Sequence, residues 1–259
     1  MSAELNSSLL TRAQAQAKDA GLTLAYTGGA LTLTGDGMAL SCNFEGMLKR
    51  ISPAKLHSEL LVRAAKIKHN ANDESSNATA HLIAVDATAG LGQDAFLLAA
   101  AGFEVYMFEQ NAVIAALLSD GLLRAANSQK LASIAPRMHL KCQDSICALQ
   151  ALNFTPDVVY LDPMFAKREK NAATKKKFQL LHKLEAPCTN ENELLKAAIC
   201  AKPKKVVVKR LPKASTLAGI KPAYAICGKA VRYDCILPNN LSKTTLSQLN
   251  PHPACLTKR

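Results

Sequence analysis

The sequence predicts an α/β protein built on a mainly parallel sheet with helices on both faces. From His81 onward, short apolar runs alternate with segments of helical periodicity, a pattern typical of consecutive β-α-β units. A loop containing two glycines follows the first apolar run. Two further strands, separated by Gly228-Lys229, come last and predict a hairpin that adds an antiparallel strand at one edge of the sheet.

Residues 1–68 do not follow this pattern and predict a small β-rich subdomain with a connecting helix. Apolar and polar residues alternate on both sides of Gly28-Gly29, which is a hairpin signal. Ser52-Pro53 is typical of a helix start, with proline in the first turn. The expected strands are 22–26, 31–34 and a possible third within 40–44, and the expected helix ends near Ile67.

Residues 81–237 carry the repeated units and predict the main domain, whereas the polar residues 238–259 predict a loosely ordered tail. Runs rich in Val, Ile and Leu predict the strands, and longer Ala- and Leu-containing stretches predict the helices. The expected strands are 82–86, 104–109, 138–142, 157–162, 206–208, 223–227 and 231–237. The expected helices are 94–101, 112–126, 175–184 and 191–200.

Composition excludes several classes of protein. Of the 259 residues, 49% are hydrophobic and 20% charged, which is ordinary for a globular chain and excludes disorder throughout. No apolar run is long enough for a membrane span and no signal peptide is visible, so we expect a cytosolic protein. The eight cysteines form no C-x-x-C pair and the six histidines show no zinc-finger spacing, so we expect buried thiols and no metal. The cysteines expected inside apolar runs are Cys142, Cys200, Cys227 and Cys235.

The positive charge is concentrated in one segment. The chain carries 32 basic and 20 acidic residues, a net charge of +12. Residues 163–213 alone hold 14 basic and 4 acidic residues, so the rest of the chain is nearly neutral. Such a segment indicates a polyanion partner such as nucleic acid, although a solvated Lys-rich surface would have the same composition.

The loop Asp86-Ala-Thr-Ala-Gly90-Leu-Gly92 leaves a strand and enters a helix, and its glycines allow close backbone approach to a ligand. Glu109, at the end of the next strand, can bind the two hydroxyls of a ribose. NAD and S-adenosylmethionine both contain that ribose. An acidic rim would repel the NAD pyrophosphate but attract the sulfonium and ammonium of S-adenosylmethionine. The rim is expected from Asp86, Asp94, Glu109, Asp144 and Asp162, although Asp94 and Asp144 are also suited to capping helices.

Asp162-Pro163-Met164-Phe165 ends a strongly apolar strand and suits the methylation of an exocyclic amine. Asp162 and the carbonyl of Pro163 can accept the two N–H bonds of the amine and orient its lone pair. Phe165 can stack on the base. A simple strand-terminating turn is the alternative for this motif taken by itself.

These strings resemble the bacterial small-subunit ribosomal RNA guanine-N2 methyltransferases of the J family. Besides the glycine loop and Tyr160-Leu-Asp-Pro-Met-Phe165, the resemblance rests on 108–111, 113–122 and 206–210 and extends over residues 80–237. It implies a Rossmann-like class I fold and methylation of a guanine N2 in 16S rRNA with S-adenosylmethionine. The implied cofactor contacts are Gln93, Asp94, Glu109, Gln110, Asp144, Ser145 and Asp162, in addition to Asp86, Gly90 and Gly92 from the loop.

Two departures from the family pattern stand out. Relatives commonly have Arg where this chain has Gln93 and Gln110, and they carry a glycine-rich stretch where 55–66 is Leu- and Ala-rich. We expect basic residues beside the catalytic motif to contact 16S rRNA or the 30S subunit. These are Lys167, Arg168, Lys170, Lys175, Lys176, Lys177, Lys209 and Arg210. Methylation of DNA adenine or another exocyclic amine, or a non-catalytic role in ribosome assembly, are the alternatives that the residues leave open.

Overall fold

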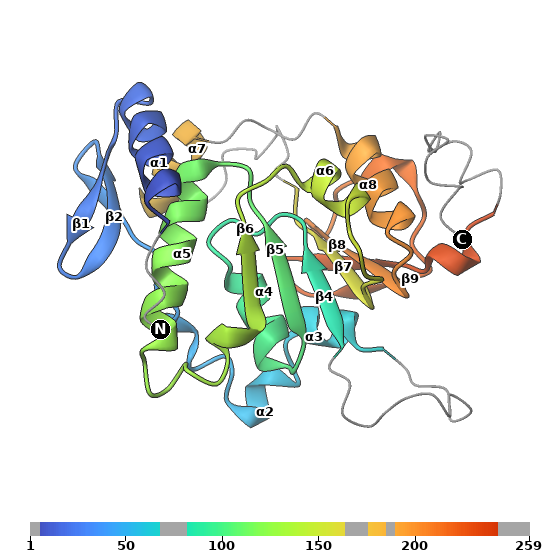
Figure 1. Ribbon diagram of the computed structural model, residues 1–259. Helices are drawn as coiled ribbons and strands as arrows, with labels where there is room; N and C mark the ends of the chain where they lie inside the picture. Colours follow the sequence, from blue (N-terminus) through green and yellow to red (C-terminus); the bar gives the residue numbers. More distant parts are fainter. Residues whose placement is uncertain (1–5, 68–81, 164–175, 185–189, 243–259) are drawn as a thin grey trace.

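A seven-stranded sheet forms the centre of the computed structural model, which describes residues 6–67, 82–163, 176–184 and 190–242 (Figure 1). Five neighbouring strands are parallel, and the closing hairpin adds two antiparallel strands at one end. In spatial order the strands are β6 (Met138–Lys141), β5 (Glu104–Phe108), β4 (Ile83–Asp86), β7 (Val158–Leu161), β8 (Lys205–Arg210), β10 (Arg232–Ile236) and β9 (Tyr224–Cys227). The predicted α/β class, parallel core and terminal hairpin are confirmed.

Successive residues of each strand face opposite sides of the sheet, and a different group of helices covers each side. Ala84 and Val158 belong to a core shared with α4 (Gln93–Ala100) and α5 (Ala112–Ala126). Val85 and Val159, one residue further along, pack with α6 (Ser145–Gln150) and α8 (Glu191–Cys200). Because a strand has a period of two, this parity fixes which helix each side chain at the strand ends can reach.

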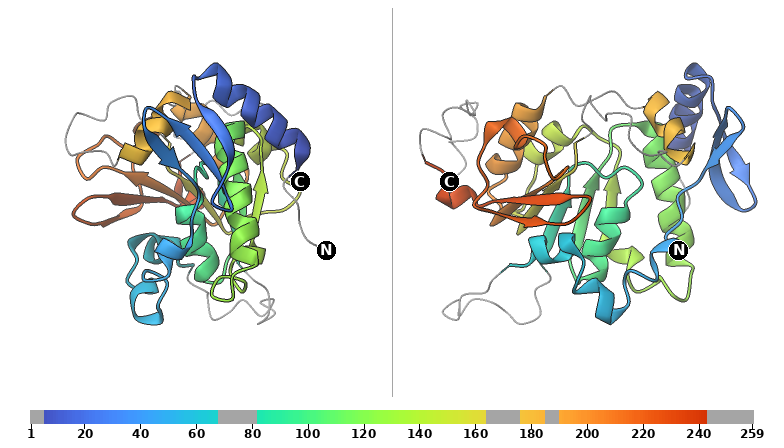
Figure 2. Two further views of the ribbon diagram at one scale, coloured as in Figure 1. Left: turned by 90° about the vertical axis from the view of Figure 1, so that its left-hand side faces the viewer. Right: turned by 180° about the vertical axis from the view of Figure 1, so that it is seen from behind.

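The N-terminal segment forms a three-stranded antiparallel sheet beside α5, together with a helix that the sequence analysis did not predict (Figure 2). This helix, α1, packs lengthwise against α5, burying Ala13 and Ala17. Asn6 caps it by accepting the amides of Ser8 and Leu9. The elements are α1 (Ser7–Asp19), β1 (Thr23–Thr27), β2 (Ala30–Gly35) and β3 (Met38–Leu40), with α7 (Lys176–Leu184) packed against β3 and β2.

The expected helix from Ser52 to Ile67 is instead two short helices, α2 (Pro53–Leu56) and α3 (Leu60–Ala65). Glu59 lies between them with an extended backbone and is the N-cap residue of α3. Its carboxylate binds the guanidinium of Arg50 through two contacts of 2.7 and 2.8 Å. Beyond this break, α3 contacts β8, β9 and β10. The short 3₁₀ turns are 45–47, 135–137, 217–219 and 238–240.

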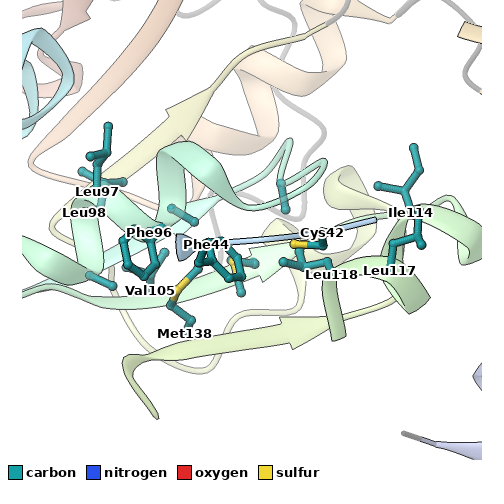
Figure 3. Packing of buried hydrophobic residues seen from close by; sticks show 14 of the residues in the cluster. Cys42, Phe44, Phe96, Leu97, Leu98, Val105, Ile114, Leu117, Leu118 and Met138 are labelled. Atoms are coloured by element: carbon teal, nitrogen blue, oxygen red, sulfur yellow. The ribbon is translucent and has the colours of Figure 1, made fainter. Parts of the chain in front are cut away.

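The N-terminal segment and the main sheet share one hydrophobic core (Figure 3). The rings of Phe44 and Phe96 stack with their centroids 5.0 Å apart, and Met138 lies close by. A buried carboxylate on α5 adds a polar link, since Asp120 accepts the amide of Leu31 at 3.1 Å. The boundaries 1–68 and 81–237 stay a prediction, because a shared core does not show how either part folds alone.

The cysteines depart from the expected set of buried thiols. Cys42 and Cys235 are buried free thiols, but Cys142 is half-buried and Cys227 is exposed. Cys200 is disulfide-bonded, and none of the other five described cysteines is its partner. The expectation was therefore wrong for Cys200 and for Cys227. Position in an apolar run did not decide burial here, because Cys227 ends the edge strand β9.

Candidate active site

The predicted acidic residues lie at the carboxyl ends of the parallel strands. Asp86 is the last residue of β4, Glu109 follows β5, and Asp162 follows β7. Asp144 lies three residues beyond β6 and caps α6, accepting the amide of Cys147 at 2.9 Å. Ligands of open parallel sheets bind beyond these carboxyl ends. The parallel arrangement predicted from the sequence therefore brings the candidate residues to one end of the sheet.

The glycine loop is bonded directly to Glu109. The amide of Gly90 donates to Glu109 Oε2 at 3.0 Å, and that of Asn111 donates to Oε1 at 2.8 Å. Burial raises the pKa of Glu109, and the amides of Asn111, Gly90 and Gln110 lower it, with a net rise. A carboxylate offers about four acceptor sites, so these bonds leave it able to accept from a ligand.

Two glycines of the loop have different roles. Gly90 has a φ of +52°, and a Cβ built on it would meet no atom within 4 Å. Gly92 has a φ of +71° and precedes α4, where a Cβ would lie 2.6 Å from the side chain of Leu118. Gly90 therefore leaves open space at the site, whereas Gly92 allows the loop to pack closely on α5.

Thr88, which the sequence analysis overlooked, joins the glycine loop to the end of β7. Its amide donates to Asp86 Oδ1 at 3.0 Å, and its hydroxyl oxygen accepts the amide of Asp162 at 2.7 Å. Burial raises the pKa of Asp86 to about 7, with further increases from Asp94 and Asp162. Through Thr88, the glycine loop is thus bonded directly to the first residue of the Asp162–Phe165 motif. A polar residue two positions after a strand-ending aspartate was the available signal.

Lys209 occupies a place different from the one expected. Its ammonium lies 2.7 Å from Asp94 Oδ2 and 2.9 Å from Asp162 Oδ2, and its side chain is 24% exposed. Tyr160 Oη donates to the same oxygen of Asp94 at 2.6 Å. Burial alone would lower the pKa of Lys209, but the two carboxylates raise it above its usual range. An ammonium held between two carboxylates is not placed to neutralise a phosphate, which corrects the expected RNA contact.

The described cations of the basic segment lie in different parts of the fold. Arg210 is buried, and its Nε donates to the carbonyl of Ser215 at 2.8 Å, so its expected RNA contact is corrected too. Lys202 and Lys204 come just before β8, at the edge of the sheet opposite the candidate site. The cations expected beside the motif lie outside the described residues, or have side chains that do. They are Lys167, Arg168, Lys170, Lys175, Lys176 and Lys177.

The remaining predicted residues border the site. Gln93 and Gln110 are exposed, and the hydroxyl of Ser145 donates to the carbonyl of Ala87 in the glycine loop. Pro163 is buried, and Phe165 lies outside the described residues. Asn111 was not singled out, yet its side chain caps α5 and donates to the carbonyl of Leu184 at 2.8 Å, holding the end of α7 beside Glu109.

Comparison with known proteins agrees with this arrangement. The family profile of SAM-dependent methyltransferases matches residues 12–238. A ribosomal RNA small subunit methyltransferase J of Neisseria meningitidis serogroup C is 37% identical over 217 residues, which cover 83% of this chain and 82% of the relative. The chain belongs to the methyltransferase J family. The ribosomal RNA small subunit methyltransferase J of Thioalkalivibrio sulfidiphilus is 43% identical over 181 residues, which cover 69% of this chain and 68% of the relative.

Solved structures place the methyltransferase in the same fold. The crystal structure of a SAM-dependent methyltransferase from Neisseria gonorrhoeae has a TM-score of 0.68 and 31% sequence identity. The match covers 93% of this chain and 95% of that one. Within the described residues, no helix is long and apolar enough to cross a membrane, and no cluster of three or more potential metal ligands occurs. The predicted Rossmann-like methyltransferase fold is confirmed.

The residues of this methyltransferase fit S-adenosylmethionine (SAM). The open space beside Gly90 lies next to Glu109, which keeps acceptor capacity for the hydroxyls of a ribose. Asp86 and Glu109 are 1% and 8% exposed, so a cationic ligand would meet them with little competing water. These two carboxylates therefore suit a cofactor that carries positive charge. The individual contact residues stay predictions.

Proposed function

We propose that this protein transfers the methyl group of SAM to the exocyclic N2 amine of a guanine in the 16S rRNA of the small ribosomal subunit. The proposal rests above all on one observation, the bridge through Thr88 between Asp86 of the cofactor loop and Asp162 of the amine-binding motif. A methyl donor bound at the glycine loop and an amine bound at Asp162 would be neighbours. Membership of the methyltransferase J family adds the class of substrate.

The chemistry assigned to the chain's own residues is orientation. The nitrogen lone pair of guanine N2 is delocalised into the ring, so the amine is a weak nucleophile. Asp162 would accept one N–H and the carbonyl of Pro163 the other, which directs the lone pair out of the ring plane and offsets the positive charge that develops on nitrogen. When bound, SAM supplies an electrophilic methyl group. As the bond from nitrogen to the methyl group forms, the nitrogen releases one proton to water, which leaves a neutral methylated base.

The RNA side of the proposal depends on the basic segment. Lysines and arginines of 167–177 would neutralise phosphates around the target nucleotide, which makes binding dependent on salt. The base must leave its stack to reach Asp162. Aromatic residues make up only 5% of the chain and Trp is absent, so recognition of a folded RNA by shape suits the protein better than a row of stacking platforms. Ribosomal RNA as substrate also implies action in the cytoplasm.

A labelling experiment tests the proposal. The protein is incubated with methyl-labelled SAM and, in parallel, 30S subunits, naked 16S rRNA and duplex DNA. Nucleosides from each digest are then separated by chromatography and identified by mass spectrometry. We expect label in 30S subunits or 16S rRNA as N2-methylguanosine. Label in N6-methyladenosine or in DNA would support another exocyclic amine. RNA binding without label on any substrate would support a non-catalytic assembly factor.

A further inference from the structure

We propose that Lys209 is a positioning residue for methyl transfer, which holds the carboxylate of Asp162 ionised and in one orientation so that it serves only as a hydrogen-bond acceptor. The inference rests on the proposed function, because it assigns Lys209 a task in the same reaction. Lys209 was expected from the sequence to contact RNA; here it contacts Asp162 instead.

The geometry places Lys209 between two carboxylates from different elements. Its Nζ is 2.7 Å from Asp94 Oδ2 in the first turn of α4 and 2.9 Å from Asp162 Oδ2 beyond β7. Strands β7 and β8 are parallel neighbours, with Leu161 opposite Val208. Lys209 and Asp162 each follow those residues by one position, so both face the α4 side of the sheet.

The anchor on the far side of Lys209 is itself fixed. Asp94 Oδ2 also accepts the hydroxyl of Tyr160 at 2.6 Å, and Tyr160 is 1% exposed. The backbone amide of Asp162 is bonded to Thr88, which fixes the main chain but not the side-chain torsion. Lys209 supplies the contact to the carboxylate itself. A positioning group that is bonded to a fixed carboxylate can impose a direction that a solvated lysine could not.

The charges around Asp162 make this cation necessary. Asp94 on α4 and Asp86 on β4 both oppose a further negative charge. Tyr160 on β7 and Tyr233 on β10 have pKa values raised by burial and stay neutral. Among the described residues, Arg50 also acts on this cluster, but its guanidinium is bound at two points by Glu59. These groups come from the elements packed around the site, and Lys209 is the cation that forms an ion pair of 2.9 Å with Asp162.

Loss of the cation would change what Asp162 can do. A carboxylate near other carboxylates and without its cation takes up a proton at higher pH. The resulting carboxylic acid carries an O–H donor, which would face the N–H of the substrate amine instead of accepting from it. Lys209 thus acts through Asp162, and its substitution should affect turnover more than the binding of RNA.

The test combines Lys209→Met, Lys209→Arg and the double variant Asp162→Asn/Lys209→Met. Single-turnover rates on 30S subunits are measured from pH 5.5 to pH 9, with SAM affinity and melting temperature measured alongside. We expect Lys209→Met to lower the rate about 10- to 100-fold, with its acidic limb moved to higher pH, and Lys209→Arg to recover most of the rate. In the double variant, the lysine change should cost less than about 2-fold beyond Asp162→Asn alone.

A matched control removes another lysine ion pair of the same length. Lys204 lies 2.9 Å from Asp157 at the opposite edge of the sheet, so Lys204→Met should leave the rate and its pH dependence unchanged. Carbon-13 NMR of aspartate-labelled protein gives a readout that needs no substrate. The resonance missing from Asp162→Asn identifies Asp162, and its titration should move to higher pH in Lys209→Met. If that variant does not fold, Asp94→Asn should move the same titration to lower pH.

The outcomes separate this inference from the proposed function. If the wild-type protein methylates no substrate while the Asp162 titration responds to Lys209 as expected, the proposed function fails and the electrostatic role of Lys209 stands. If the wild-type protein is active but Lys209→Met changes neither the titration of Asp162 nor the pH dependence of the rate, the inference is wrong. Additive losses in the double variant would also overturn it, because Lys209 would then act independently of Asp162.

Discussion

The amide of Gly90 donates a hydrogen bond of 3.0 Å to the carboxylate of Glu109. This bond joins the first and second units of the parallel sheet at the point where SAM is expected to bind. The second oxygen of Glu109 is held by Asn111. Glu109 is therefore fixed in place before any ligand arrives, and a ligand that meets it does not have to order a flexible side chain.

Glu109→Ala should weaken SAM by about 1.5–3 kcal/mol, the usual value of hydrogen bonds to a charged group. Titration calorimetry with SAM measures the loss. Glu104→Ala is the matched control, since Glu104 begins the same strand at the opposite edge and pairs there with His139. Equal SAM affinity of the Glu109 variant and the wild-type protein would mean that the ribose lies elsewhere.

Asp86 should make the ligand-free protein less stable as pH rises. Its folded pKa of about 7 lies above the ordinary value of 3.8, so the folded state binds more protons between these two pH values. Stability therefore falls across this window, by on the order of 4 kcal/mol in full. Asp86→Asn lacks the ionisation but can still accept the amide of Thr88. Urea unfolding at pH 5 and pH 8 measures the free energy of unfolding of both proteins. Relative to the wild-type protein, the variant should be more stable at pH 8 than at pH 5. A constant difference at both pH values would contradict the assigned burial cost.

Gly121 on α5 is expected to tolerate no side chain. A Cβ there would lie 2.5 Å from Cys42 Sγ and 2.8 Å from Cys42 Cβ. Gly121→Ala should destabilise the protein by about 1–3 kcal/mol through overpacking, despite the helix preference of alanine. Thermal unfolding measures the effect. Gly46→Ala is the control, because a Cβ on Gly46 would meet no atom within 4 Å. Equal melting temperatures of the two variants would show that α5 can move away from the N-terminal segment.

The position of the cations predicts which of them bind RNA. Neutralising Lys175, Lys176 and Lys177 should weaken binding of 30S subunits and reduce the salt dependence by a log-log slope of about 0.7–0.9 per lost phosphate contact. Neutralising Lys202 and Lys204, at the opposite edge, should change neither quantity. Filter binding at several salt concentrations compares the two sets. An unchanged slope for the first set would mean that these lysines are only a solvated surface.

Most of the fold could be predicted because its signals are local. Continuous apolar runs marked the parallel strands, and α5 and α8 begin and end where periodicity and polar flanks predicted. Helix α1 was missed because its apolar stripe is narrow and consists mainly of alanine, with Ala13 and Ala17 buried against α5. The break between α2 and α3 was missed because a helical pattern does not reveal it; Glu59, which precedes α3, pairs there with Arg50.

Some residues of the candidate site could also be predicted from the sequence, and others could not. Residues that end strands could be assigned to one edge, because parallel strands all end there. The burial and the bonding partners of Lys209 and Arg210 could not be predicted from their place in a basic segment. Both depend on which residues the neighbouring elements supply. The period-two pattern does put Lys209 on the same face as Val207 and Tyr160. What it lacked was the position of α4, which brings Asp94 over that face.

We propose that Asp162 orients the amine that receives the methyl group, and Asp162→Asn tests this role most directly. The variant keeps the shape of the side chain but loses the anion and one acceptor atom. The measurement is the single-turnover rate of N2-methylguanosine formation on 30S subunits at saturating SAM. We expect a loss on the order of 10²–10³ with nearly unchanged RNA affinity, since phosphate contacts dominate binding. A rate near that of the wild-type protein would contradict the account.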